Sequence, residues 1–192
     1  MTLYELLNSQ KQYLIGKRAI IFDMDGTLID SMQYWTNSIG EDLTEYSSFG
    51  EFMSEKYNTV IKPKEHAFEF LRLLRKSSIP VCIATDTPKW MSKGFFERYP
   101  ELSSLIDFYI DCEDVGTSKR QSPRIYGAAA ERLGFEKREC IVFEDHRHAV
   151  LAASADGFDV VGVYDPANAE NAEIIKENSV DYINDFSEMM KG

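Results

Sequence analysis

Short apolar runs alternate with amphipathic stretches along this chain of 192 residues. Runs dense in Ile, Val, Phe and Cys predict strands over 18–24, 79–85, 108–112, 140–143 and 159–163, and a weaker run predicts a further strand near Tyr182. Strands that are apolar throughout are typical of a sheet with both faces covered, because neither face of such a strand suits water.

The segments between these runs carry apolar residues at helical spacing. They predict helices over 64–76, 89–98, 122–133, 147–156 and 167–177. For the third helix we expect Ser122 as N-cap, Pro123 at the first helical position and Gly134 just past the end. Thr2 and Glu5 form a capping box that opens a short N-terminal helix.

The alternation of strand and helix predicts a doubly wound, mainly parallel α/β fold. The carboxyl ends of its strands would share one edge, where sheets of this kind bind ligands. Residues 31–61 interrupt the alternation, because they show no strand pattern and are rich in aromatic side chains. This stretch has room for about two helices of average length. We therefore predict a core of residues 1–30 and 62–192 with a small helical insert at 31–61.

The composition of the chain limits the kinds of molecule that we expect the protein to bind. The formal net charge of −11 argues against a broad contact with the phosphate backbone of nucleic acid, and less strongly against a small anionic substrate. No basic leader followed by an apolar core opens the sequence, and no apolar stretch is long enough to cross a bilayer. We expect a cytoplasmic protein without nucleic-acid or membrane partners, monomeric or weakly dimeric. Its three cysteines, Cys82, Cys112 and Cys140, would then be reduced and buried.

The most informative chemistry follows the first apolar run, which ends in Asp23-Met24-Asp25-Gly26-Thr27. In an extended segment Asp23 and Asp25 point to the same side. Two carboxylates so close repel each other unless a cation lies between them, and an oxygen-only site suits Mg²⁺. Gly26 allows the chain to turn sharply away.

This segment resembles the first motif of the haloacid dehalogenase superfamily, D-x-D-G-T. The resemblance implies that Asp23 is a nucleophile toward phosphorus and that Asp25 is a general acid/base. The insert at 31–61 lies where that family places a helical cap, although here it is short. The alternative is a helical hairpin that only covers the core. Trp35 would correspondingly either approach the leaving group or pack the insert onto the core.

Two later segments resemble the family's phosphate-binding and cationic motifs. Thr85 ends the second strand, so its hydroxyl and the free N–H groups of the following helix can hold phosphate, whereas Asp86 is more naturally a backbone or capping group. A cation should follow the third strand, and Lys119 and Arg120 both fit. We favour Lys119, because a compact ammonium suits a site between anions better than a planar fork.

The fourth predicted strand ends in Glu144-Asp145, which resembles the family's metal-binding motif. Asp145 would bind Mg²⁺ directly and Glu144 would assist, often through water. His146 and His148 lack a third imidazole nearby, so we expect them to flank the cleft or face solvent. We expect His66 to be structural.

Together the residues and the resemblance predict a Mg²⁺-dependent phosphomonoester hydrolase that acts on a small phosphorylated metabolite through an aspartyl-phosphate. Mg²⁺ would be held by Asp23, the Asp25 carbonyl oxygen, Asp145 and Glu144. Gly26, Thr27, Thr85, Asp86 and Trp35 are the expected substrate-binding residues. A sugar phosphomutase and a non-catalytic phosphate-binding scaffold remain alternatives. A dehalogenase is disfavoured, because its pattern lacks the aspartate found here at position 25.

Overall fold

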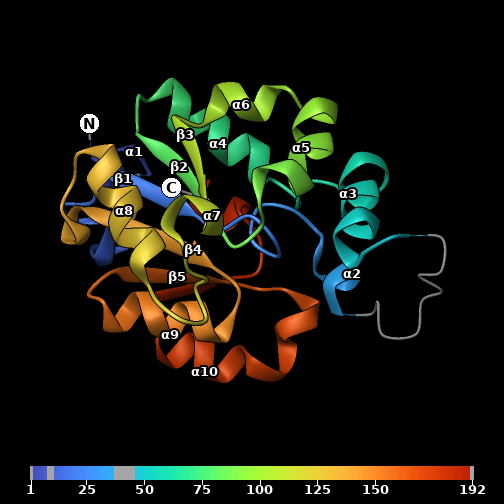
Figure 1. The fold of residues 1–192 in the computed structure, drawn as a ribbon. Coiled ribbons are helices and arrows are strands. Elements are labelled where there is room, and N and C mark those ends of the chain that lie inside the picture. The colour runs from blue at the N-terminus through green and yellow to red at the C-terminus, as the bar shows by residue number, and fades with distance from the viewer. Residues whose placement is uncertain (1, 8–10, 37–45, 191–192) are drawn as a thin grey trace.

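The computed structural model describes residues 2–7, 11–36 and 46–190 (Figure 1). Its centre is a six-stranded parallel sheet in the order β3-β2-β1-β4-β5-β6, which confirms the predicted fold class. The strands are β1 (Ala19–Phe22), β2 (Val81–Thr85), β3 (Phe108–Asp111), β4 (Cys140–Glu144), β5 (Asp159–Val163) and β6 (Asp181–Ile183).

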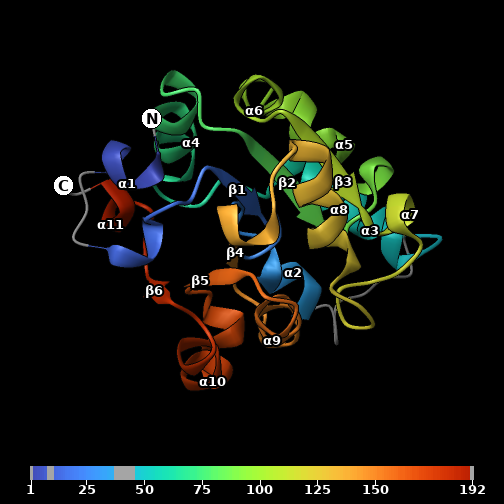
Figure 2. The same cartoon turned by 90° about the vertical axis from the view of Figure 1, so that its left-hand side faces the viewer.

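Alternate side chains of β1 enter two separate apolar layers. Ile20 and Phe22 belong to one buried cluster, and Ala19 and Ile21 belong to the other. All four residues are buried, so the continuous apolar run follows from helices that cover both faces. Figure 2 shows this layering, with α1 and α4 on one side of the sheet and α9 on the other.

The helices of the first face are α1 (Leu3–Leu6), α4 (Ala67–Lys76), α5 (Lys89–Arg98), α6 (Glu101–Leu105) and α11 (Ser187–Met190). The other face is covered by α8 (Arg124–Leu133), α9 (Arg147–Ala155) and α10 (Ala172–Glu177). Shorter elements complete the core: α7 (Cys112–Val115) and the 3₁₀ helices η1 (Gln12–Leu14), η2 (Lys137–Glu139) and η3 (Pro166–Asn171).

Some details of the core differ from the sequence-based expectations. Pro123, rather than Ser122, occupies the N-cap position of α8, and the Ser122 hydroxyl accepts a hydrogen bond from the Arg124 N–H. The predicted helix 167–177 is divided, because the 3₁₀ helix η3 precedes α10. Cys82 and Cys140 are buried free thiols, whereas Cys112 is partly exposed at the start of α7.

Residues 31–61, the predicted insert, contain α2 (Met32–Thr36) and α3 (Phe49–Thr59), and residues 37–45 lie outside the described part of the chain. Figure 1 shows α2 and α3 together at one end of the molecule, beyond the end of the sheet. α3 packs closely against α5, where a Cβ placed on Gly94 would lie 2.6 Å from the Asn58 Cβ. Among the described residues, no helix is long and apolar enough to cross a membrane.

Candidate active site

A cleft of about 470 Å³ lies at the carboxyl ends of β1, β2 and β4, and α2 forms part of its wall. The parallel strands bring together residues that are far apart in sequence. The cleft is lined by Asp23, Asp25, Met32, Trp35, Thr85, Asp86, Thr87, Lys119, Arg120, Glu144, His146, His148 and Ala149.

Asp23 lies at the floor of this cleft, directly after β1. Its backbone N–H donates to the Phe143 carbonyl at 2.9 Å, which fixes the start of the loop on β4. The Lys119 ammonium contacts Asp23 Oδ1 and lies 3.3 Å from Glu144 Oε1. Burial raises the pKa of Asp23 to about 6, although the Lys119 charge opposes this rise. Asp23 is therefore mainly a carboxylate at neutral pH.

Asp25 is held by three hydroxyl groups. Oδ1 accepts from Ser31 at 2.6 Å and also from Tyr57, and Oδ2 accepts from Thr87 at 2.6 Å. These donors come from the loop before α2, from α3 and from the loop after β2. The Asp25 side chain thus lies where the insert and the core meet.

Asp145 follows β4 and is fully buried. Its Oδ1 accepts from the Thr27 hydroxyl at 2.9 Å, and its Oδ2 accepts from Asn168 Nδ2 at 2.6 Å. Gly26 makes this approach possible, because its φ is +85° and a Cβ there would lie 2.2 Å from Asp145 Oδ2. Thr27 and Gly26 therefore shape the position of Asp145, and the Thr27 hydroxyl is committed to that carboxylate.

The acidic groups fit a hard divalent cation. Asp23, Glu144 and Asp145 each offer a carboxylate oxygen, and these oxygens lie within 4.8 Å of one another. Burial, with repulsion from Asp23, raises the pKa of both Glu144 and Asp145 well above the usual range. Glu144 Oε2 is buried without a hydrogen-bond partner. An oxygen-only set with an unsatisfied acceptor suits Mg²⁺, which prefers carboxylate oxygens.

The loop after β2 supplies the neighbouring polar groups. Thr85 is buried, and its Oγ1 accepts from the Thr87 N–H at 3.1 Å. Asp86 Oδ1 accepts from the Lys119 N–H at 2.8 Å, so Asp86 fixes the loop that carries the lysine. Arg120 is exposed at the cleft.

The rim of the cleft is partly aromatic. Trp35 Nε1 donates to the Tyr57 hydroxyl at 3.3 Å, and the indole meets the Phe49 ring edge-on with centroids 5.4 Å apart. His146 and His148 stack with centroids 5.3 Å apart and face the same cleft. Trp35 therefore borders the cleft and also contacts two residues of α3, Phe49 and Tyr57.

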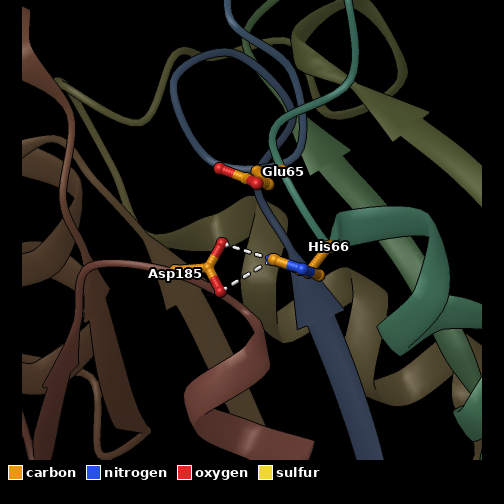
Figure 3. Close-up of side chains that lie close together, drawn as sticks. All are labelled: Glu65, His66 and Asp185. Atoms are coloured by element: carbon orange, nitrogen blue, oxygen red, sulfur yellow. Dashed lines mark hydrogen bonds and ion pairs between the residues drawn. The ribbon is translucent and has the colours of Figure 1, made fainter.

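A second acidic cluster, Glu65, His66 and Asp185, lies outside this cleft (Figure 3). His66 Nδ1 is 2.9 Å from each oxygen of Asp185, as the dashed lines in Figure 3 show. The imidazole is therefore engaged in an ion pair that joins the start of α4 to the loop before α11. This contact agrees with the structural role expected for His66.

Several groups in the site were not identified from the sequence. Tyr57 and Ser31 contact Asp25, Asn168 contacts Asp145, and Tyr126 donates to Glu144 Oε1 at 3.1 Å. Ser31 closely follows the first motif and Tyr126 follows the segment with Lys119 and Arg120, whereas Tyr57 and Asn168 lie in segments with no site motif. Asn168 follows the fifth strand, and a polar side chain after a strand end is a signal that could have suggested it.

Known proteins resemble this chain in sequence and in fold. A "Probable pseudouridine-5'-phosphatase" from Drosophila melanogaster is 26% identical over 187 residues, which covers 76% of this chain and 81% of the relative. "(DL)-glycerol-3-phosphatase 2" from Arabidopsis thaliana is 33% identical over 104 residues, or 52% of this chain and 43% of the relative.

The fold is also similar to that of solved structures. A HAD family hydrolase from Deinococcus radiodurans R1, with bound phosphate and sodium, superposes with a TM-score of 0.69 at 22% identity, covering 91% of this chain and 93% of the other. CbbY from Rhodobacter sphaeroides, in complex with phosphate, gives a TM-score of 0.71 at 15% identity, covering 90% and 96%. The family model for haloacid dehalogenase-like hydrolases matches residues 41–155, more than half of the chain. The chain belongs to the haloacid dehalogenase-like hydrolases.

Proposed function

We propose that this hydrolase is a Mg²⁺-dependent phosphomonoesterase that works through an aspartyl-phosphate on Asp23. The observation that carries the proposal is the contact of Asp23 with the buried Lys119 ammonium at the floor of a cleft. A carboxylate with a pKa of about 6 is ionised at neutral pH and can attack phosphorus. Relatives named as phosphatases support the same reaction class.

In the first step an Asp23 oxygen forms a bond to phosphorus while the bond from phosphorus to the ester oxygen breaks. Asp25 donates its proton to the departing alcohol oxygen. In the second step Asp25 accepts a proton from water, whose oxygen attacks phosphorus as the bond to Asp23 breaks. Phosphate leaves, and both carboxyl groups return to their starting states.

The other groups have positioning or electrostatic roles in this proposal. Thr85 and nearby backbone N–H groups hold phosphoryl oxygens, and Lys119 offsets the charge that gathers on Asp23 and phosphate. When bound by Asp23, the Asp25 carbonyl, Asp145 and Glu144, Mg²⁺ would orient the phosphoryl group and offset its negative charge. Gly26 and Thr27 act through Asp145, and Asp86 acts through the Lys119 loop.

We further propose that residues 31–61 form a cap insert on a core of residues 1–30 and 62–192. Trp35, Met32, His146 and His148 then face the alcohol part of the substrate. A cleft of about 470 Å³ supports a small phosphorylated metabolite as the substrate class. Of the described residues in 31–61, Met32 and Trp35 line the cleft. This partial cover favours hydrolysis over the mutase reaction, because a mutase must exclude water.

The direct test is hydrolysis of 4-nitrophenyl phosphate by the purified protein with Mg²⁺ and with excess chelator. We expect activity only with the metal, and none in Asp23→Asn, whose amide is not a nucleophile. Mass spectrometry of acid-quenched enzyme should show phosphate on the peptide that contains Asp23. Full activity in chelator would reject the metal assignment, and near wild-type turnover by Asp23→Asn would reject the covalent route. A panel of phosphorylated metabolites would then rank substrates.

A further inference from the structure

The side chain that exchanges the proton in the proposed reaction is held from the insert as well as from the core. The Tyr57 hydroxyl of α3 contacts Asp25 Oδ1, whereas the Thr87 hydroxyl bonds the other carboxylate oxygen, Oδ2. Tyr57 is fully buried, whereas Asp25 is partly exposed to the cleft, so the contact holds the carboxyl group from its buried side. We propose that Tyr57 is a positioning residue for Asp25, which holds the carboxyl group in line with the leaving oxygen.

The hydrogen-bond directions support this role. An indole N–H can only donate, so the Trp35 bond of 3.3 Å makes the Tyr57 oxygen an acceptor. Thr87 lies 3.5 Å from the Tyr57 oxygen, but it gives its proton to Asp25 Oδ2 at 2.6 Å. The Tyr57 proton is therefore available for Asp25 Oδ1. Trp35 orients the phenol, and the phenol orients the carboxylate.

The packing of α3 keeps Tyr57 at this position. A Cβ on Gly94 would lie 2.8 Å from the Asn58 Cα, so the backbones of α3 and α5 are in close contact one residue from Tyr57. Arg98 Nη1 donates to the Tyr57 carbonyl at 3.2 Å and to the Ile61 carbonyl at 2.9 Å, which attaches the end of α3 to α5. α3 thus carries its tyrosine on a fixed support rather than on a free loop.

Hydroxyl partners also suit the chemistry of Asp25. In the proposed reaction this group is protonated before the alcohol leaves and ionised before water attacks. A hydroxyl can donate to a carboxylate and accept from a carboxylic acid, whereas an ammonium or a backbone N–H can only donate. Tyr57, Ser31 and Thr87 can therefore stay hydrogen-bonded to Asp25 through both steps of the proposed reaction.

This inference rests on the proposed phosphomonoesterase activity, and it predicts a dependence on the leaving group. An alkyl alcohol needs its oxygen protonated as it departs, whereas 4-nitrophenolate leaves without that help. Loss of the Tyr57 hydroxyl should thus slow alkyl esters selectively. The constant to compare is kcat/KM, because it covers the steps up to departure of the alcohol.

The test measures kcat/KM of wild type and Tyr57→Phe with glycerol 2-phosphate and with 4-nitrophenyl phosphate. We expect a loss of about tenfold or more for the alkyl ester, a part of the roughly 10²–10⁴-fold that a positioned acid contributes, and a much smaller loss for the aryl ester. Tyr46→Phe is the matched control, because its hydroxyl bonds Glu55 within the insert and not Asp25. The control should leave the ratio of the two constants at the wild-type value.

The possible outcomes distinguish a failure of the positioning role of Tyr57 from a failure of the proposed phosphomonoesterase activity. Equal losses on both esters, or a Tyr57→Phe variant that does not fold by circular dichroism, would show that the hydroxyl serves the fold and would overturn the positioning role. Unchanged constants on both esters would overturn it too. Wild-type protein that hydrolyses neither ester with Mg²⁺ would instead overturn the proposed function, and the role of Tyr57 with it.

Discussion

Lys119 shows how burial and charge together set the role of one side chain. Its ammonium is 5% exposed and lies between Asp23 and Glu144. Burial lowers the pKa of Lys119, but the two carboxylates more than offset this and keep that pKa well above its usual range. The neighbouring Arg120 faces solvent at the rim of the cleft. Two adjacent cations thus have different surroundings.

We expect Lys119→Ala and Arg120→Ala to differ sharply in kcat. Removal of the buried ammonium takes away charge stabilisation in a partly desolvated site, so kcat should fall by about 10²–10³-fold, as for loss of one oxyanion donor. Removal of the exposed guanidinium should cost a few-fold at most, and it serves as the matched control. The measurement is steady-state kinetics with Mg²⁺ on variants shown to be folded by circular dichroism. Small and equal losses would mean that neither cation neutralises the nucleophile.

The sequence allowed some of these residues to be predicted and not others. Asp23 and Asp25 stand in a compact motif directly after an apolar strand, so strand geometry alone puts them together. Lys119 was favoured over Arg120 only on the chemistry of the ammonium group, because the loop length that decides between the two cations is a property of the folded chain. Tyr57 reaches Asp25 only through the packing of α3 on α5, which no local pattern of residues encodes.

The close contact between α3 and α5 holds α3 in a fixed position relative to the sheet domain. Two helices pack this closely only where a side chain is missing, and Gly94 provides that gap opposite Asn58. Gly50 plays a similar part at the start of α3, since a Cβ there would lie 2.7 Å from the Trp90 ring. α3 is therefore attached to α5 along a helix face.

Gly94→Ala should lower the free energy of unfolding by about 1–3 kcal/mol, because overpacking forces the two helices apart. Gly127→Ala is the matched control, since Gly127 also lies inside a helix but its nearest neighbour would be 4.0 Å from the new Cβ. There alanine should stabilise by about 0.5–1 kcal/mol through its helix propensity. Urea unfolding of the three proteins provides the measurement. A neutral Gly94→Ala variant would show that the interface is loose.

Element boundaries followed from sequence where the local pattern was strong. The strand Asp159–Val163 and the helix Lys89–Arg98 end at the predicted residues. The helix predicted at 64–76 begins instead at Ala67, because His66 before it adopts a left-handed φ of 57°. Asp185, the hydrogen-bond partner of His66, lies 119 residues further along the chain, so no local pattern of residues predicts this contact.

The His66–Asp185 pair should make stability depend on pH. The hydrogen bond to Asp185, with the nearby charges of Glu65 and Glu69, raises the pKa of His66 above 6.5. The folded state therefore binds the His66 proton more tightly, and its contribution to stability is full below pH 6.5 and is lost as pH rises through the raised pKa. We expect His66→Gln to lower the melting temperature at pH 6 and to change it less at pH 9. A pH-independent difference would show that the charge on His66 does not matter.

The fold of the whole molecule places several acidic side chains together at the active-site cleft. The chain carries a net charge of −11, and the parallel sheet brings Asp23, Glu144 and Asp145 to the carboxyl ends of neighbouring strands β1 and β4. The buried Lys119 ammonium pairs with two of these acidic groups, Asp23 and Glu144. Such a centre is costly to the fold by itself, because buried like charges repel. A bound divalent cation would offset this repulsion, and the same carboxylates would then connect β1 and β4 through the metal.

This arrangement predicts that Mg²⁺ stabilises the folded protein as a whole. A ligand that binds the native state but not the unfolded chain raises stability by about 2.7 kcal/mol at a concentration of 100 times its dissociation constant, so the melting temperature should rise with Mg²⁺. Asp145→Asn should remove that response, because it deletes a predicted ligand. The same change should leave the metal-free protein as stable as wild type or more so, since it removes one of the repelling charges.

Asp156→Asn at the far end of α9, where Asp156 pairs with Lys137, is the control and should keep the full Mg²⁺ response. Differential scanning calorimetry with and without Mg²⁺ gives all six values. A wild-type melting temperature that is indifferent to Mg²⁺, or an undiminished rise in Asp145→Asn, would place the metal elsewhere.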